Sequence, residues 1–176
     1  MRVIKDRKIV DDDWTLLAPD APIPPSGDVI VSLAQWNAAV ASGSAASPPS
    51  PPAPHPPPLD RTGRVGVVLH SDELPEKIEQ LDRLPLIAID FPKFGDGRGY
   101  SSARLLRTRF GYKGELRAVG DVLHDQLFYM ARCGIDSFAL KPGKDIEGAL
   151  KAFDDFSVAY QAAADDQRPL FRRVSR

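Results

Sequence analysis

Cysteine is nearly absent from this sequence, in which Cys133 is the only one among 176 residues. A single cysteine cannot form an internal disulfide or a redox dithiol, and it cannot supply a Cys/His zinc site or an iron–sulfur cluster. A c-type haem motif, a Walker loop and a clean dinucleotide-binding glycine motif are absent as well. The sequence therefore predicts a protein with no bound cofactor.

An excess of charge of one sign and long apolar runs are also lacking. The formal net charge is −1, so the protein as a whole does not attract nucleic acid or an anionic membrane. The start, MRVIKDRKIVDDDW, has no apolar signal-peptide region, and no apolar run approaches the length that spans a membrane. We therefore expect a cytoplasmic protein that binds neither nucleic acid nor membrane.

The first 60 residues divide into a β-rich segment and a proline-rich loop. Apolar pairs at 3–4 and 9–10 flank the polar stretch KDRK, which predicts a hairpin, and residues 27–40 predict a short strand followed by a helical turn or two. We expect residues 1–40 to pack on the core. Residues 41–60 hold eight of the 17 prolines, which indicates a surface loop because proline cannot donate to a sheet ladder.

Residues 61–164 repeat a strand–helix pattern four times. The predicted strands are short and almost continuously apolar, at residues 65–69, 86–89, 116–119 and 137–140. Apolar residues at helical spacing follow each strand: Leu74, Ile78 and Leu81, then a helix at about 101–110, then Leu123, Leu127 and Met130, then a last long helix marked by Ile146, Leu150, Phe153 and Tyr160. The basic tail, residues 165–176, is expected to be loose.

This pattern predicts an α/β fold in which four consecutive βα units form a parallel sheet with right-handed crossovers. Four units are half of a typical eight-unit barrel. The expected architecture is therefore a half-barrel or an open twisted sheet, with the N-terminal β-hairpin beside it. An open sheet keeps unpaired edges, and two-fold dimers are common, so we also expect a homodimer that covers an edge.

One polar residue follows each predicted strand: His70, Asp90, Asp121 and Lys141. Ligands gather at the carboxyl ends of parallel strands, so these four are the candidate catalytic residues. The two carboxylates could hold a Mg²⁺-like cation, with the lysine or histidine as proton carrier. Helix capping and a Pro-Gly turn are the alternative explanations for Asp121 and Lys141.

The glycine-rich segment 95–102, GDGRGYSS, lies between a predicted strand and a predicted helix. Glycines let a backbone approach an anion, and the start of a helix favours negative charge. The candidate anion-binding residues are Lys93, Gly97, Arg98, Gly99, Ser101 and Arg104. A tight connecting loop explains the same residues without a ligand. The basic stretch 98–117 suits docking to an acidic partner or, equally, a solvated surface.

The run LIAIDFPKFGDGRGYSSARLLRTRFGYKGELRAVGDVLHDQLFYMARCGIDSFAL, residues 86–140, resembles the core of a bacterial domain family of unknown function. The opening hairpin and VSLAQWNA, residues 31–38, resemble it too, so the resemblance covers all but the proline-rich insert and the tail. This family is encoded beside sulfite or nitrite reductase and sulfate-assimilation genes, and its members are often labelled oxidoreductases of sulfite reduction. The resemblance carries no catalytic residues over to this chain.

Two functions from different classes follow. The resemblance, together with the lack of cofactor motifs, implies an accessory protein of assimilatory sulfite reduction, which docks the electron donor of sulfite reductase or aids assembly of the reductase. Its partners would then be sulfite reductase or that donor. The alternative is a metal-assisted enzyme that acts on a small anion at the carboxyl ends of the strands. The residues alone leave open whether the protein is an enzyme.

Overall fold

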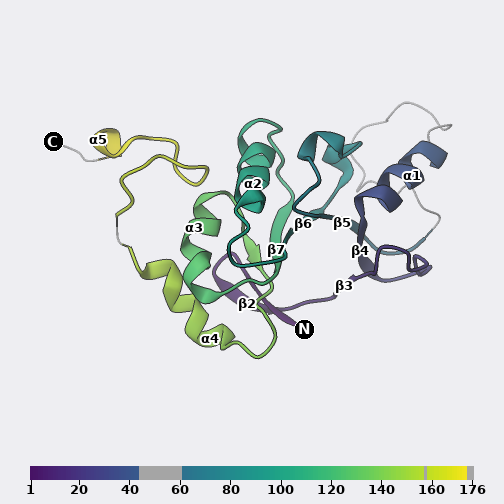
Figure 1. Cartoon of the computed structure of the whole chain (residues 1–176), viewed down its shortest axis with the longest axis horizontal. Coiled ribbons are helices and arrows are strands. Elements are labelled where there is room, and N and C mark those ends of the chain that lie inside the picture. Colours follow the sequence, from purple (N-terminus) through teal and green to yellow (C-terminus); the bar gives the residue numbers. More distant parts are fainter. Residues whose placement is uncertain (44–60, 157, 174–176) are drawn as a thin grey trace.

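The computed structural model describes residues 1–43, 61–156 and 158–173 (Figure 1). Their main feature is one eight-stranded sheet, whose strands are β1 (Arg2–Lys5), β2 (Lys8–Asp11), β3 (Trp14–Leu16), β4 (Asp28–Ser32), β5 (Val65–Leu69), β6 (Leu86–Phe91), β7 (Glu115–Gly120) and β8 (Ser137–Phe138). The order across the sheet is β2-β1-β8-β7-β6-β5-β4-β3. Strands β3 to β8 are parallel to one another, whereas β1 is antiparallel to both β8 and β2. The α/β class and the parallel βα core are therefore confirmed.

The N-terminal hairpin is also confirmed. Asp6 and Arg7 connect β1 to β2, and both have positive φ, 49° and 61°. Two left-handed residues in a two-residue loop match the right-handed twist of paired strands. The hairpin joins the parallel sheet through β8, where Ile4 lies opposite Phe138.

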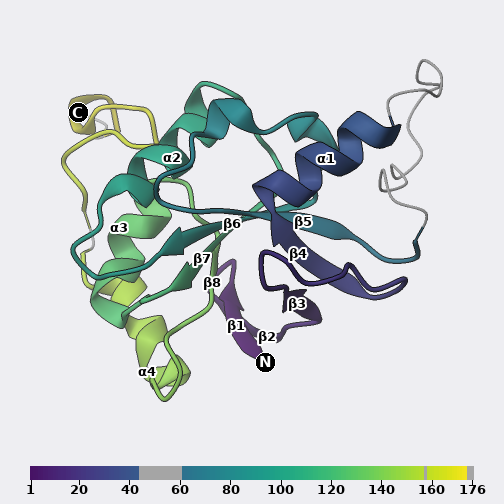
Figure 2. The same ribbon diagram turned by 45° about the vertical axis from the view of Figure 1, so that its right-hand side comes forward.

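The sheet curls into a half-barrel (Figure 2). Only Asp12 and Asp13 separate β2, at one edge of the sheet, from β3, at the other. Residues 8–16 therefore pair with β1 through their first half and with β4 through their second half. This segment spans the open side of the half-barrel. The edge strands β2 and β3 each pair with one neighbour only, and the predicted homodimer stays a prediction.

Helices α1 (Leu33–Gly43), α2 (Arg98–Thr108), α3 (Leu127–Arg132) and α4 (Ile146–Ala149) lie on the outer face of the curled sheet (Figures 1 and 2). The short helix α5 (Leu170–Arg173) lies away from the sheet (Figure 1). The short 3₁₀ turns are η1 (Pro75–Lys77), η2 (Leu81–Arg83), η3 (His124–Gln126) and η4 (Leu150–Asp154). Helix α1 starts at a capping box, because Ser32 Oγ accepts from the Gln35 N–H at 3.3 Å and Gln35 Oε1 accepts from the Ser32 N–H at 3.0 Å. Among the described residues, no helix has both the length and the apolar character needed to cross a membrane.

The two faces of the sheet carry two hydrophobic clusters. The outer cluster joins strands to helices through residues such as Trp36, Leu106 and Leu127. The inner cluster contains side chains from the strands or their ends alone: Val3, Ile30, Val68, Leu86, Ala88, Val119 and Ala139, with Trp14 packed against them. Strands β1, β4, β5, β6 and β7 contribute to both clusters, because successive side chains of a strand point to opposite faces.

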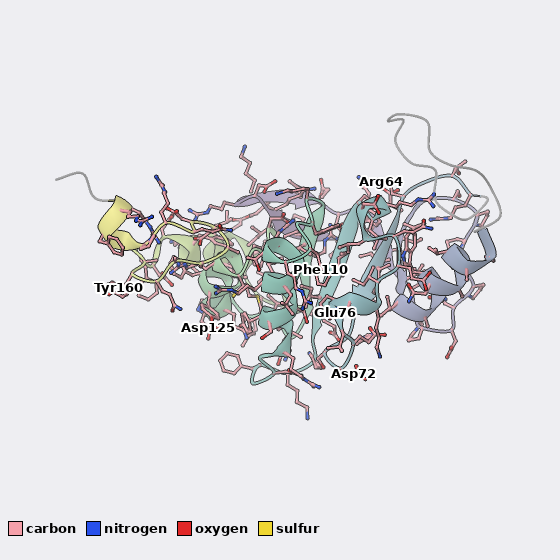
Figure 3. The ribbon with its side chains drawn as sticks, turned by 90° about the horizontal axis from the view of Figure 1, so that it is seen from above. Arg64, Asp72, Glu76, Phe110, Asp125 and Tyr160 are labelled. Carbon is pink, nitrogen blue, oxygen red and sulfur yellow. The ribbon has the colours of Figure 1, made fainter. Side chains whose placement is uncertain are left out.

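Three predicted elements are wrong in detail. The segment between β5 and β6 forms the turns η1 and η2 instead of a helix. The left-handed Gln80, φ 48°, separates the two turns, and Pro85 holds Leu84 extended. The last helix stops at Asp154, and Tyr160 is 84% exposed, at the end of the molecule that carries α5 (Figure 3). The tail includes the short helix α5. Most of the predicted proline-rich loop lies outside the described residues.

Candidate functional site

The candidate catalytic residues lie where the parallel strands end. Figure 3 shows the direction of these strands: Arg64, which precedes β5, lies on one side of the molecule, and Asp72 and Asp125, which follow β5 and β7, lie on the other. The ends of neighbouring strands are tied by backbone hydrogen bonds. The Asp121 N–H donates to the Phe91 carbonyl at 2.7 Å, and the Lys141 N–H donates to the Val122 carbonyl at 3.1 Å.

His70 and Asp90 form a hydrogen-bonded pair at this end. The distance from His70 Nδ1 to Asp90 Oδ2 is 3.0 Å, and the side chains are 41% and 23% exposed. By alternation they lie on the inner face, two residues beyond Val68 and Ala88 of the inner cluster. The backbone of His70 is held as well, because its N–H donates to Glu73 Oε2 at 2.8 Å and its carbonyl accepts from the Glu73 N–H at 3.0 Å.

Asp121 and Lys141 form a second, separate pair, with 2.8 Å between Lys141 Nζ and Asp121 Oδ1. This hydrogen bond, together with the nearby charge of Lys144, holds the pKa of Asp121 below its usual range. The four candidate residues are thus brought to one end of the sheet but divided into two pairs. In the part of the chain that the structure describes, no three His, Cys, Asp or Glu side chains are grouped to hold a metal ion. The alternative of a metal-assisted enzyme has no ligand cluster there to support it.

The geometry of the first pair predicts the tautomer of His70. Because Asp90 accepts from Nδ1, the neutral imidazole should carry its proton on Nδ1 and leave the Nε2 lone pair free to accept a proton. Long-range ¹H–¹⁵N spectra at neutral pH should show this tautomer, and Asp90→Ala should shift the population toward protonated Nε2. The surface histidine His124 is the internal reference. A His70 ring protonated on Nε2 in the parent protein would show that Asp90 does not orient it.

In the glycine loop before α2, a carboxylate of the protein itself, that of Asp96, lies at the start of the helix. Arg98 reaches back to Asp96 through two hydrogen bonds, Nε–Oδ1 at 3.0 Å and Nη2–Oδ2 at 2.7 Å, and its backbone N–H donates to Asp96 Oδ1 at 3.1 Å. These bonds to Arg98 hold the pKa of Asp96 far below its usual range. An added Cβ at Gly99 would lie 2.7 Å from the Phe91 ring, so this glycine serves helix–sheet packing. An external anion would have to displace the Asp96 carboxylate.

The remaining candidates of this loop are open to solvent. No other residue lies within 4 Å of the position that a Cβ would take at Gly97. The side chains of Lys93, Ser101 and Arg104 are exposed. The structure therefore brings Arg98 and Ser71 together, at 3.0 Å between Nη2 and Oγ, but it does not gather these side chains around one point. Anion binding at this loop stays a prediction.

Comparison with known protein families identifies the family of this chain. The model of a family described as "Bacterial protein of unknown function (DUF934)" matches residues 66–171, well over half of the chain. The chain belongs to this family. Searches of the curated proteins and of the solved structures found no match.

The matched range shows which parts of the site belong to the family domain. Both ion pairs, His70–Asp90 and Asp121–Lys141, lie within residues 66–171. The match also extends into the predicted tail. It does not include β1 to β4, and so it omits the segment 8–16 that spans the half-barrel. The resemblance that we expected for the opening hairpin and residues 31–38 therefore lies outside the match.

Two arginines of the predicted basic surface point into the protein instead. Arg107 donates to the carbonyls of Gly134, Tyr112 and Gly114, each at 2.8 Å, and to the carboxylate of Asp136. Arg117 is only 3% exposed. Arg107 and Arg117 therefore do not belong to an exposed basic surface, because their guanidinium groups fasten loops and strands together, whereas Arg98, Arg104, Arg109 and Lys113 are exposed.

Arg117 belongs to a buried network that sequence reasoning missed. Its guanidinium bonds Asp12 Oδ1 at 2.7 Å and Glu115 Oε1 at 2.7 and 2.9 Å, and Lys5 Nζ bonds Glu115 Oε2 at 2.6 Å. Burial alone would raise the pKa of Glu115, but the bond from Lys5 and the charge and bonds of Arg117 outweigh it, so the pKa is lowered. The alternation Glu115, Arg117, Val119 along β7 was the available signal, since it places both charges on the inner face.

Proposed function

We propose that this protein is an accessory protein of assimilatory sulfite reduction, which docks the electron donor of sulfite reductase or aids assembly of the reductase. The observation that carries the proposal is membership of the family that matches residues 66–171, because the resemblance associates that family with sulfite and nitrite reductase genes. The lack of sequence motifs for a flavin, haem or iron–sulfur cluster favours a supporting role over electron transfer by this chain itself. The absence of a bound cofactor stays a prediction.

An aromatic patch on the family domain supports a docking role. It consists of Tyr100 and Tyr129, of which Tyr129 is 60% exposed, and the backbone of Phe94, whose side chain is 55% exposed, is joined to it through Gln126. The rings of Tyr100 and Tyr129 lie 5.2 Å apart, and Gln126 Nε2 lies 3.3 Å from the Tyr100 hydroxyl and 3.5 Å from the Phe94 carbonyl. Exposed aromatic side chains that are grouped in this way mark surfaces where proteins bind one another.

Deleting the gene tests the role in the cell. The deletion strain should fail to grow with sulfate or sulfite as sulfur source and should grow with cysteine or sulfide, because only the reduction step is lost. Complementation with Tyr129→Ser should restore growth less well than complementation with Tyr160→Ser. Tyr160 is a matched control because it is 84% exposed and lies outside the aromatic patch, at the end of the molecule that carries α5 (Figure 3). Equal growth of the deletion strain on all four sulfur sources would contradict a role in sulfite reduction.

A further inference from the structure

Three adjoining hollows cross the open, carboxyl end of the half-barrel. The first, about 330 Å³, reaches His70 and is bordered by Leu16. The second, about 260 Å³, shares Leu16 with the first. The third, also about 260 Å³, shares Met1, Leu140 and Pro142 with the second. Because neighbouring hollows share lining residues, they adjoin one another, and together we call them the mouth groove.

The middle of the mouth groove is mostly apolar. Its walls are formed mainly by Trp14, Leu16, Ile30, Val119, Ala139 and Leu140. The two charged side chains that border it, Asp12 and Arg117, are bonded to each other at 2.7 Å and so offer no free charge. An apolar body that enters here removes apolar surface from water, which is the main source of affinity in small-molecule sites.

One end of the mouth groove is basic. The charged side chains that line it are Arg2, Lys141 and Lys144, all of them cations. Asp121 accepts from Lys141, but both lysines act on this one carboxylate. The ion pair of Arg2 with Glu147 is long, 3.5 Å, and exposed on both sides. The charged side chains that line this end are therefore all cations, which attract an anionic group.

The opposite end is formed by Leu17, Ala18, Pro19, Ser32, Val68 and His70. Ser32 is occupied as the cap of α1. His70 remains as the polar group that can face a ligand here, with its Nδ1 engaged by Asp90. The groove thus combines a basic end, an apolar middle and a single imidazole.

We infer that the mouth groove binds a small organic anion with an apolar body. The carboxylate, sulfonate or phosphate group lies between Lys141 and Lys144, the apolar body covers Leu16, Val119 and Leu140, and the far end of the molecule approaches His70. The site is independent of the proposed role in sulfite reduction, since it depends on the hollows and charges alone.

Calorimetry with naphthalene-2-sulfonate tests the inference. The parent protein should bind the sulfonate, and should bind the neutral naphthalene-2-sulfonamide and inorganic sulfate more weakly. Lys144→Gln should weaken sulfonate binding about three- to fivefold, as loss of one exposed ion pair does. Leu16→Asp should abolish binding; because Leu16 is 51% exposed, this variant should keep its fold. Lys113→Gln, an exposed lysine before the amino end of β7, makes the same charge change and should have no effect.

Three results would overturn the inference. The first is no binding of the sulfonate to the parent protein. The second is equal affinity for the sulfonate and either the sulfonamide or sulfate, because the site requires both the charge and the apolar body. The third is equal weakening by Lys144→Gln and Lys113→Gln. Because these measurements use the purified protein, they are separate from the growth test of the proposed function.

Discussion

Replacing Arg117 with alanine is expected to lower the free energy of unfolding by about 3–5 kcal/mol, the usual cost of removing one partner from a buried ion pair. The guanidinium lies between Asp12, in the link from β2 to β3, and Glu115, on β7. Without it, the buried carboxylates of Asp12 and Glu115, which are 7% and 9% exposed, lose the cation between them. Lys5 remains bonded to Glu115. Urea unfolding at neutral pH measures the change.

The matched control is Arg109→Ala. Arg109 pairs with Glu76 at 3.4 Å, and their side chains are 66% and 40% exposed. Exposed pairs of this kind contribute about 0–1 kcal/mol, so this variant should unfold close to the parent. If both variants lowered the free energy of unfolding by a similar, small amount, the network inside the half-barrel would not hold the segment 8–16 in place.

The pH dependence adds an independent check on the same network. The pKa of Glu115 is lowered in the folded protein, so its contribution to stability is present above the unfolded pKa of about 4.3 and is lost as pH falls through the folded pKa. In Arg117→Ala the charge and hydrogen bonds of Arg117 no longer offset the effect of burial, so the pKa of Glu115 should rise. Protonation then relieves the buried charge, and the gap between variant and parent should narrow at acidic pH. A gap that widens on acidification would contradict this account.

The parallel core could be predicted because its signals are local. Each predicted strand is a short apolar run, and β5, β6 and β7 form where those runs lie. The meeting of His70 with Asp90 and of Asp121 with Lys141 follows from the same pattern, since neighbouring parallel strands end at one edge. The division into two closed pairs depends on side-chain positions that strand spacing does not define.

The closure of the half-barrel could not be predicted, because it depends on contacts between distant parts of the chain. Ile4 pairs with Phe138, and Arg117 bonds Asp12, across more than a hundred residues of sequence. Nothing near Asp12 in the sequence indicates that the strand before it and the strand after it pair with opposite edges of one sheet. Arg117 was misplaced on the surface for a different reason: a count of basic residues along 98–117 overlooks the alternation along β7, which places Arg117 on the inner face.

Gly120→Ala is expected to destabilise the protein by about 3 kcal/mol, from a strained backbone and a steric clash together. Gly120 ends β7 with φ 93°, which L side chains rarely adopt. A Cβ here would lie 2.5 Å from the Phe91 carbonyl oxygen and 2.7 Å from Asp90 Oδ1. The backbone oxygen belongs to β6 and cannot move aside cheaply, so the cost falls on the strand pairing itself. Thermal or urea unfolding measures it.

The same substitution should also disturb the candidate site, because the new methyl group displaces the Asp90 carboxylate from His70. The population of His70 protonated on Nδ1 should therefore fall in Gly120→Ala, in the folded protein and before any unfolding. Gly97→Ala is the matched control, since a Cβ there meets no atom within 4 Å and Gly97 has φ −85°. That variant should keep both the stability, within about 0.5 kcal/mol, and the His70 tautomer of the parent. A Gly120→Ala protein as stable as Gly97→Ala, with the tautomer unchanged, would mean that β6 and β7 can separate at this end without cost.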